Sequence, residues 1–175
     1  MMRILTVALV VVALTGIIAV SAKTVLFLRI HEESMRPGLC PGDIIVVAVK
    51  KSQDVPLERD FLGRIVVFSN REGGLSVKRV YGLAGDKVTF SEGFVESSVR
   101  ANDFATCGLA GRPDKAYIDT VPRDQIFLVG DNLPISSDSR AFGPVPEKTL
   151  VGEVVFGIPM RLGTCGCRSP VALGK

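Results

Sequence analysis

The sequence predicts a mostly β domain attached to a single N-terminal transmembrane helix, and three observations support this fold class. Residues 4–22 carry no charged side chain. The rest of the chain holds short runs rich in β-branched residues and bounded by turn-forming residues. No stretch beyond residue 30 shows sustained helical periodicity. The 175 residues therefore divide into an anchor and juxtamembrane segment at 1–29, a β-rich domain at 30–158 and an irregular tail at 159–175.

The N-terminal apolar segment is long enough to cross a bilayer. As a helix, residues 4–22 would span about 28 Å, close to the ~30 Å hydrocarbon core of a membrane. A cleaved secretory signal is the alternative, because "VSA" before Lys23 resembles a small-residue cleavage site. The apolar run exceeds the ~7–15 residues usual for the core of such a signal, so its length favours an uncleaved anchor. The flanking charges do not define its orientation.

Beyond the anchor, six short apolar runs predict strands. They are 43–49, 64–69, 75–83, 86–90, 125–130 and 150–158. Many short strands separated by turns are typical of a β-barrel or β-sandwich. Residues 91–122 lack such a pattern and predict a long loop or small insertion.

The composition argues against nucleic-acid binding and against a structural zinc site. The net charge is only +3, tryptophan is absent and tyrosine occurs twice, so neither a basic patch nor a base-stacking platform is expected. The chain has a single histidine, and its four cysteines are not spaced as CxxC pairs, which does not favour zinc. The oligomeric state stays open.

The cysteines permit several interpretations. We interpret the Cys165-Gly-Cys167 stretch as a pair of terminal thiols rather than a redox or metal element. A disulfide between Cys40 and Cys107 would be compatible with a domain outside the cytoplasm, and the sequence leaves it open.

Ser34 is a candidate nucleophile just beyond the anchor. A serine hydroxyl needs a neighbouring base, and His31 is the only histidine in the chain. In an extended segment, positions 31 and 34 would point to opposite faces and lie about 10 Å apart. His31 is therefore a poor candidate for the base and is better interpreted as an interfacial residue.

Lys78 is the alternative base. It lies in the strand pattern 75–83, where alternation places it on the same face as Val80. A lysine on an apolar face either extends to water or is buried, and burial lowers its pKa. Because a nearby carboxylate would oppose that shift, we expect Glu32 and Glu33 to be held away from the Lys78 amine.

A third polar cluster occupies residues 129–145, where a strand pattern ends in Gly130-Asp131-Asn132 and Asp138 lies two positions before Arg140. By itself this is a polar loop with a salt bridge. The alternative is a scaffold whose serines and ion pairs join two strands and orient the lysine.

Three separated segments resemble, in order and spacing, the motif boxes of type I signal peptidases, which are membrane-anchored Ser-Lys proteases. The segments are "ESMRPGLCPGD" (33–43), "KRVYGLAGD" (78–86) and "VGDNLPISSDSRAFGPVPEKTLVGEV" (129–154). "RIVVFS" (64–69) looks like the intervening strand of that family. The resemblance covers about residues 30 to 158.

The resemblance implies Ser34 as nucleophile and Lys78 as general base. It also implies that Ser136 hydrogen-bonds the lysine amine and that Met35 lies beside the nucleophile.

The resemblance further implies two structural ion pairs, Asp131 with Arg79 and Asp138 with Arg140. The implied architecture is a signal-peptidase-like β catalytic domain, held by one helix at the outer face of the cytoplasmic membrane. No metal or cofactor is implied.

Three positions depart from the family pattern. Glu32 stands where relatives often carry a small or hydroxyl residue, two positions before the nucleophile, and an ionised carboxylate cannot donate to an oxyanion. Gly63-Arg64 replaces a Gly-Asp pair, and Gly38 replaces a threonine.

The expected function is removal of signal peptides from exported preproteins, with preprotein signal peptides and the lipid bilayer as partners. One alternative is a specialised peptidase that matures a pilin or transferred protein. Another is a non-catalytic secreted β-domain with a cleaved signal, and a third is an inactive relative in which Glu32 impairs the oxyanion site. A self-cleaving repressor would need a DNA-binding headpiece in place of the apolar segment.

Overall fold

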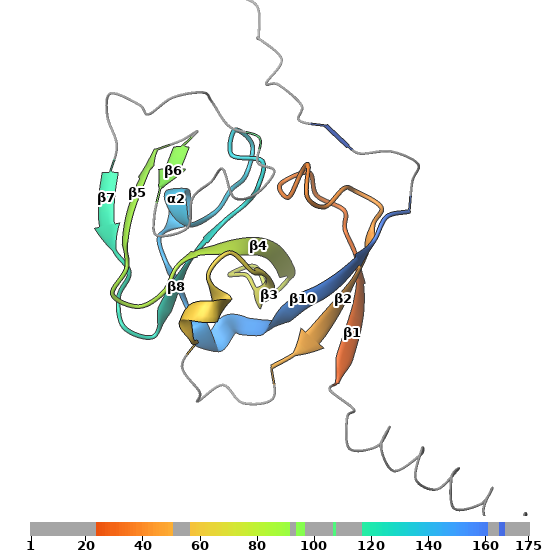
Figure 1. The fold of residues 1–175 in the computed structure, drawn as a ribbon, viewed down its shortest axis with the longest axis horizontal. Coiled ribbons are helices and arrows are strands. Elements are labelled where there is room, and N and C mark those ends of the chain that lie inside the picture. The colour runs from red at the N-terminus through yellow and green to blue at the C-terminus, as the bar shows by residue number, and fades with distance from the viewer. Residues whose placement is uncertain are drawn as a thin grey trace, which may run out of the picture.

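The computed structural model describes residues 24–50, 57–91, 94–96, 107, 117–160 and 165–166, and it is mostly β (Figure 1). The main sheet has seven strands in the order β1-β2-β10-β3-β4-β8-β9. Its strands are β1 Val25–Arg29, β2 Ile44–Val49, β3 Ile65–Ser69, β4 Leu75–Gly82, β8 Gln125–Val129, β9 Val145–Pro146 and β10 Leu150–Ile158. All its neighbouring strands run antiparallel.

A smaller sheet and three short helical turns complete the described part. The small sheet has the order β6-β5-β7. Its strands are β5 Lys87–Ser91, β6 Phe94–Glu96 and β7 Tyr117–Thr120. The helical turns are η1 Arg59–Phe61, α2 Ser139–Phe142 and η3 Glu147–Thr149.

Among the described residues the core forms three clusters, one of which lies where the two sheets meet, and β8 is buried on both faces. Ile126 and Leu128 pack with the main-sheet cluster, whereas Phe127 and Val129 pack with the cluster that includes Val88 of the small sheet. Gly82 allows this close approach, because a Cβ there would lie 2.8 Å from Val88 Cγ2. The residues leading out of β8 are thereby held in a rigid frame.

All six predicted strands occur, with small shifts at their ends, but the prediction missed four others. β1 lies in the segment predicted as juxtamembrane, where its apolar residues continue the pattern of 4–22. β6 and β7 lie within 91–122, so this segment is not simply a loop. β6, β7 and the two-residue β9 are too short to show an alternation of apolar and polar residues in the sequence. They form strands because β6 and β7 pair with β5 and β9 pairs with β8.

Among the described residues, no helix is long and apolar enough to cross a membrane. The predicted anchor at 4–22 lies outside the described residues.

The interpretation of Cys165 as a terminal thiol was wrong, and the Cys40–Cys107 disulfide that the sequence left open does not form. Cys40 forms a disulfide with Cys165, 125 residues away, and Cys107 is also disulfide-bonded. Cys165 is therefore not a terminal thiol, and Cys40 does not pair with Cys107. The chain beyond β10 passes beside the β1–β2 connection, where Asp43 accepts hydrogen bonds from the backbone N–H groups of Cys40 (2.9 Å) and Met160 (3.2 Å). Cysteine spacing does not reveal such a juxtaposition.

Removing the Cys40–Cys165 disulfide should destabilise the domain. The double variant Cys40→Ser/Cys165→Ser should lose about 2–5 kcal/mol of unfolding free energy, because the bond closes a long loop in the unfolded chain. Urea denaturation of oxidised protein measures this loss. The double variant avoids an unpaired thiol, and an unchanged midpoint and slope would contradict the prediction.

Candidate active site

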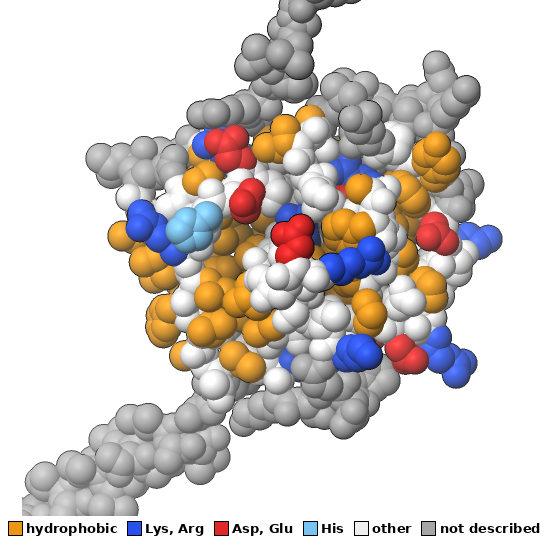
Figure 2. Space-filling model, turned by 180° about the vertical axis from the view of Figure 1, so that it is seen from behind, with side chains coloured by type: hydrophobic (Ala, Val, Ile, Leu, Met, Phe, Trp, Pro, Cys, Tyr) orange, Lys and Arg blue, Asp and Glu red, His pale blue; other side chains and the backbone are white. Residues whose placement is uncertain are grey.

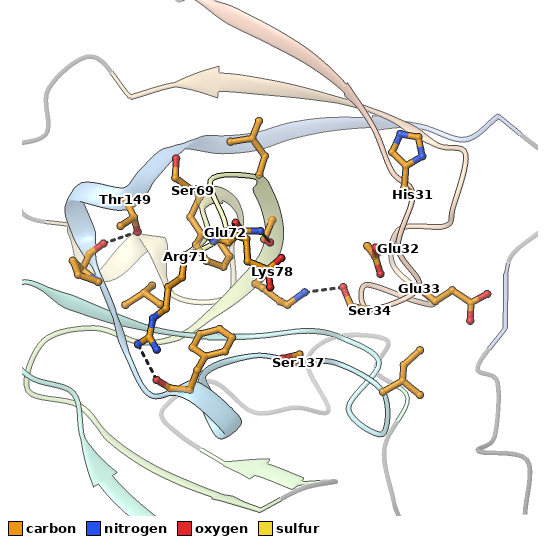
Figure 3. Close-up of a pocket in the computed structure, with 18 residues that line it drawn as sticks. His31, Glu32, Glu33, Ser34, Ser69, Arg71, Glu72, Lys78, Ser137 and Thr149 are labelled. Carbon is orange, nitrogen blue, oxygen red and sulfur yellow. Dashed lines mark hydrogen bonds between the residues drawn. The ribbon is translucent and has the colours of Figure 1, made fainter. Parts of the chain in front are cut away.

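Lys78 lies in β4 with its side chain on the face that carries the main core. It is directly opposite Val66 of β3, shares its face with Val80, and is only 6% exposed. Its amine reaches a cleft of about 740 Å³, lined by the β1–β2 connection, the β3–β4 hairpin and the segment around α2 (Figure 3). A buried strand thus presents a basic group to an open cleft.

The Lys78 Nζ and the Ser34 Oγ lie 2.7 Å apart and are hydrogen-bonded across this cleft (Figure 3). Ser34 belongs to a tight turn in the β1–β2 connection, closed by a 3.1 Å hydrogen bond from Arg36 N–H to the Glu33 carbonyl. A hydroxyl and an amine at this distance can exchange a proton directly.

Burial lowers the pKa of Lys78 below its ordinary value of 10.5. The carboxylates of Asp138, Glu32 and Asp131 oppose this shift, in that order, and Arg140 adds to it. The net effect is a lowered pKa of Lys78, because desolvation of the buried amine is the largest of these effects. Glu32 acts on Lys78 through its charge alone, and it opposes the lowering of the pKa without reversing it.

Arg79 points to the opposite face of β4 and makes a two-pronged ion pair with Asp131. The Nε–Oδ1 and Nη2–Oδ2 distances are both 2.7 Å, and Nη1 donates to the Gly63 carbonyl at 2.6 Å. Burial raises the pKa of the Asp131 carboxyl, while the hydrogen bonds from Arg79 lower it in opposition. Gly38 lies close against this pair, since a Cβ at that position would lie 2.8 Å from Asp131 Oδ2.

The Gly63-Arg64 pair, which departs from the Gly-Asp of the family pattern, is compatible with the Arg79–Asp131 ion pair. Gly63 contributes only its carbonyl to Arg79, and the Arg64 side chain forms ion pairs with Asp60 and Glu153, each at 2.7 Å.

Asp138 and Arg140 form the second ion pair, with Nε–Oδ1 at 2.8 Å and Nη2–Oδ2 at 2.9 Å. Asp138 also caps the N-terminus of α2 and accepts a 3.0 Å hydrogen bond from the Gly130 N–H. Arg140 donates to the Leu133 carbonyl at 2.8 Å. Together these contacts hold both ends of the loop between β8 and α2.

Ser136 does not hydrogen-bond the Lys78 amine, contrary to the expectation. Its buried Oγ has no hydrogen-bond partner in the part of the chain that the structure describes. It packs against Gly130, where an added Cβ would lie 2.2 Å from Ser136 Oγ and 2.5 Å from the Ser34 carbonyl oxygen. Only glycine at position 130 lets the turn that carries Ser34 and the Ser136 side chain approach so closely.

Met35 and His31 lie on either side of Ser34 in different environments. Met35 is buried in the cluster that includes Ile45 and Val67, so its packing anchors the turn that carries Ser34. His31 is exposed at the edge of the cleft and lies apart from the Lys78–Ser34 bond (Figure 3).

Sequence reasoning missed Asn132 and Arg71. Asn132 is completely buried and donates hydrogen bonds to the turn that carries Ser34. Its position directly after Gly130-Asp131 at a strand end was the only available signal. Arg71 extends from the β3–β4 hairpin to the Phe142 carbonyl at 3.3 Å, with its guanidinium 6.0 Å from the Phe142 ring centroid.

Comparisons with known proteins find signal peptidases. A family model for signal peptidases, peptidase S26, matches residues 1–158. Signal peptidase IB of Staphylococcus aureus is 30% identical, over 73% of this chain and 74% of that relative. Signal peptidase I V of Bacillus subtilis is 29% identical, over 79% and 89% respectively. The crystal structure of a signal peptidase I from Enterococcus faecalis is 24% identical, with a TM-score of 0.42, over 61% of this chain and 98% of its own.

Breaking the Arg79–Asp131 pair should strongly destabilise the domain. Asp131→Asn should lower the unfolding free energy by about 3–5 kcal/mol, because it leaves the buried Arg79 charge without its counter-charge. Arg59→Ala is the matched control, since it removes an ion pair with Asp86 in which the arginine is 63% exposed and should cost at most about 1 kcal/mol. Equal losses in urea denaturation would contradict this assignment.

Lys78→Met should change the pH dependence of stability. Because the pKa of Lys78 is lower in the folded protein, the unfolded chain binds more protons between the two pKa values, and wild-type stability falls as pH decreases through that window. The stability of the variant relative to wild type should therefore rise as pH is lowered from 10.5 towards neutrality. Urea denaturation across this range tests the sign, and the exposed Lys148, changed to Met, controls for the lost positive charge. A relative stability that falls instead would refute the lowered pKa.

Proposed function

The chain belongs to the signal peptidase family, peptidase S26, and we propose that it is a membrane-bound serine endopeptidase that removes signal peptides from exported preproteins with Ser34 as nucleophile and Lys78 as general base. Membership of this family implies serine peptidase activity. The observation that carries the proposed dyad is the 2.7 Å contact between the buried Lys78 amine and the Ser34 hydroxyl.

In this mechanism, the neutral Lys78 amine accepts the Ser34 proton as Oγ attacks the scissile carbonyl. The resulting ammonium then protonates the leaving amine of the downstream peptide. Water hydrolyses the acyl-enzyme, with the lysine again acting as base. Burial supports this role because the lowered pKa of Lys78 increases the fraction of the neutral form near neutral pH.

The Ser34 N–H is the proposed oxyanion donor. Among the described residues it donates no hydrogen bond, so it is available to a substrate carbonyl oxygen. Glu32 cannot take this role while ionised, which leaves more of the stabilisation to the backbone.

The proposed substrate is an extended segment that follows the apolar core of a signal peptide, with small residues such as Ala at the −1 and −3 positions. The cleft around Ser34 would bind this segment in extended form, with its backbone paired like an added strand.

Two observations support a catalytic domain at the outer face of the cytoplasmic membrane. The Cys40–Cys165 disulfide is typical of an oxidising compartment. Phe27 of β1 and Phe156 of β10 flank Val46 of β2 and are more than 60% exposed. Figure 2 shows hydrophobic side chains gathered over the side of the domain that β1 and β2 occupy, and β1 directly follows the proposed anchor in the sequence.

Ser34→Ala and Lys78→Ala should each abolish cleavage of a signal-bearing preprotein, while the domain remains folded. The first change removes the attacking oxygen, and the second removes the base. Cleavage is followed by gel electrophoresis and by mass spectrometry of the released peptide, with circular dichroism to check folding. His31→Ala is the matched control and should retain wild-type activity. Full activity of either dyad variant would refute the mechanism.

A further inference from the structure

Asn132 connects the loop after β8 to the turn that carries Ser34. Its backbone N–H donates to the Ser34 carbonyl at 2.9 Å, and its side-chain Nδ2 donates to the Glu33 carbonyl at 3.2 Å. One residue therefore holds two consecutive carbonyls of the nucleophile turn.

The bond to the Glu33 carbonyl constrains the Ser34 N–H. The two groups belong to one planar trans peptide unit and point in opposite directions. Fixing the carbonyl on one side therefore fixes the direction of the N–H on the other. The hydrogen bond from Arg36 to the same carbonyl lies within the turn and moves with it, whereas Asn132 ties the turn to the frame of the domain.

Asn132 is itself held firmly on both sides. The Asp131 carbonyl accepts from Cys107 N–H at 2.7 Å, and the Leu133 N–H donates to the Cys107 carbonyl at 2.8 Å. The Asp131 carboxylate is paired with Arg79, which directly follows Lys78 in β4. The anchor of the nucleophile turn is thereby connected to the strand that carries the proposed base.

The Asn132 side chain is a poor choice for packing alone. The residue is completely buried, and its Oδ1 has no hydrogen-bond partner among the described residues. A buried acceptor without a partner lowers stability, and an apolar side chain of similar size would avoid that cost. What the amide supplies is the Nδ2 hydrogen bond to Glu33.

We propose that Asn132 is a positioning residue for the oxyanion site, whose side-chain amide anchors the Glu33 carbonyl and so aims the Ser34 N–H at the substrate carbonyl oxygen. This inference rests on the proposed function, with Ser34 as nucleophile. The role is more important here because Glu32 occupies a position from which it cannot donate while ionised.

The test compares Asn132→Leu with wild type on a peptide that contains a signal cleavage site. Loss of the anchoring bond should lower kcat about ten- to hundredfold and leave KM within about twofold, because the oxyanion forms only on the way to the transition state. Rates are referred to the folded fraction, measured by near-UV circular dichroism. Should Asn132→Leu not fold, Asn132→Ala removes the same amide without adding a branched side chain.

A second readout separates positioning from a general structural role. A peptide aldehyde forms a tetrahedral adduct with the serine and places its oxygen where the oxyanion lies. Its affinity should fall about as much as kcat, whereas the affinity of the matching cleaved peptide, which forms no adduct, should stay within about twofold of wild type.

Ser139→Ala is the matched control. Ser139 is buried at the start of α2 near the same loop, and its Oγ accepts a 3.0 Å hydrogen bond from the Leu128 N–H. Its replacement should lower stability without changing kcat. A wild-type kcat in Asn132→Leu, or an equal loss of affinity for aldehyde and cleaved peptide, would overturn the role of Asn132 alone. An inactive wild-type protein, or activity in Ser34→Ala, would overturn the proposed function and this inference with it.

Discussion

The site depends on keeping one amine dehydrated in a region that also contains carboxylates. Asp138 and Asp131 both act to raise the pKa of Lys78, yet burial of the amine prevails. Each carboxylate is held by its own arginine, Arg140 or Arg79, in a buried two-pronged pair. Because these pairs satisfy the carboxylates locally, the loop can be polar and well ordered beside Lys78 without binding the amine directly.

The loop between β8 and α2 positions the residues around Lys78 and Ser34. Gly130 lets Ser136 and the Ser34 carbonyl approach, Asp131 binds β4 through Arg79, and Asn132 holds the nucleophile turn. Asp138 returns to the Gly130 N–H and closes the loop. These contacts involve residues at or just after the end of β8, which is buried on both faces. A rigid core strand therefore helps to position Ser34, although Ser34 itself lies on a turn.

The Cys40–Cys165 disulfide holds the other side of the turn that carries Ser34. Cys40 follows Ser34 by six residues and joins the chain beyond β10, while Asp43 accepts backbone hydrogen bonds from both segments. Met35 packs in the core with Leu39 and Ile45. The turn that carries Ser34 lies outside the strands. It is held by the packing of Met35, by the hydrogen bonds of Asn132 and by the disulfide of Cys40.

The sequence by itself determined the mostly β class and six of the strands. Its motif boxes also singled out Ser34 and Lys78 as candidate site residues. Alternation in a strand and the composition of the motif boxes are local, and local patterns survive in a linear chain. Only the tertiary structure decided that Cys40 binds Cys165, that Ser136 lies against Gly130 without bonding the lysine, and that Asn132 anchors the Glu33 carbonyl. The contacts of Cys40 and Asn132 join segments that are far apart in the sequence and that the seven-stranded sheet brings together. The distances that select one partner over another exist only once the chain has folded.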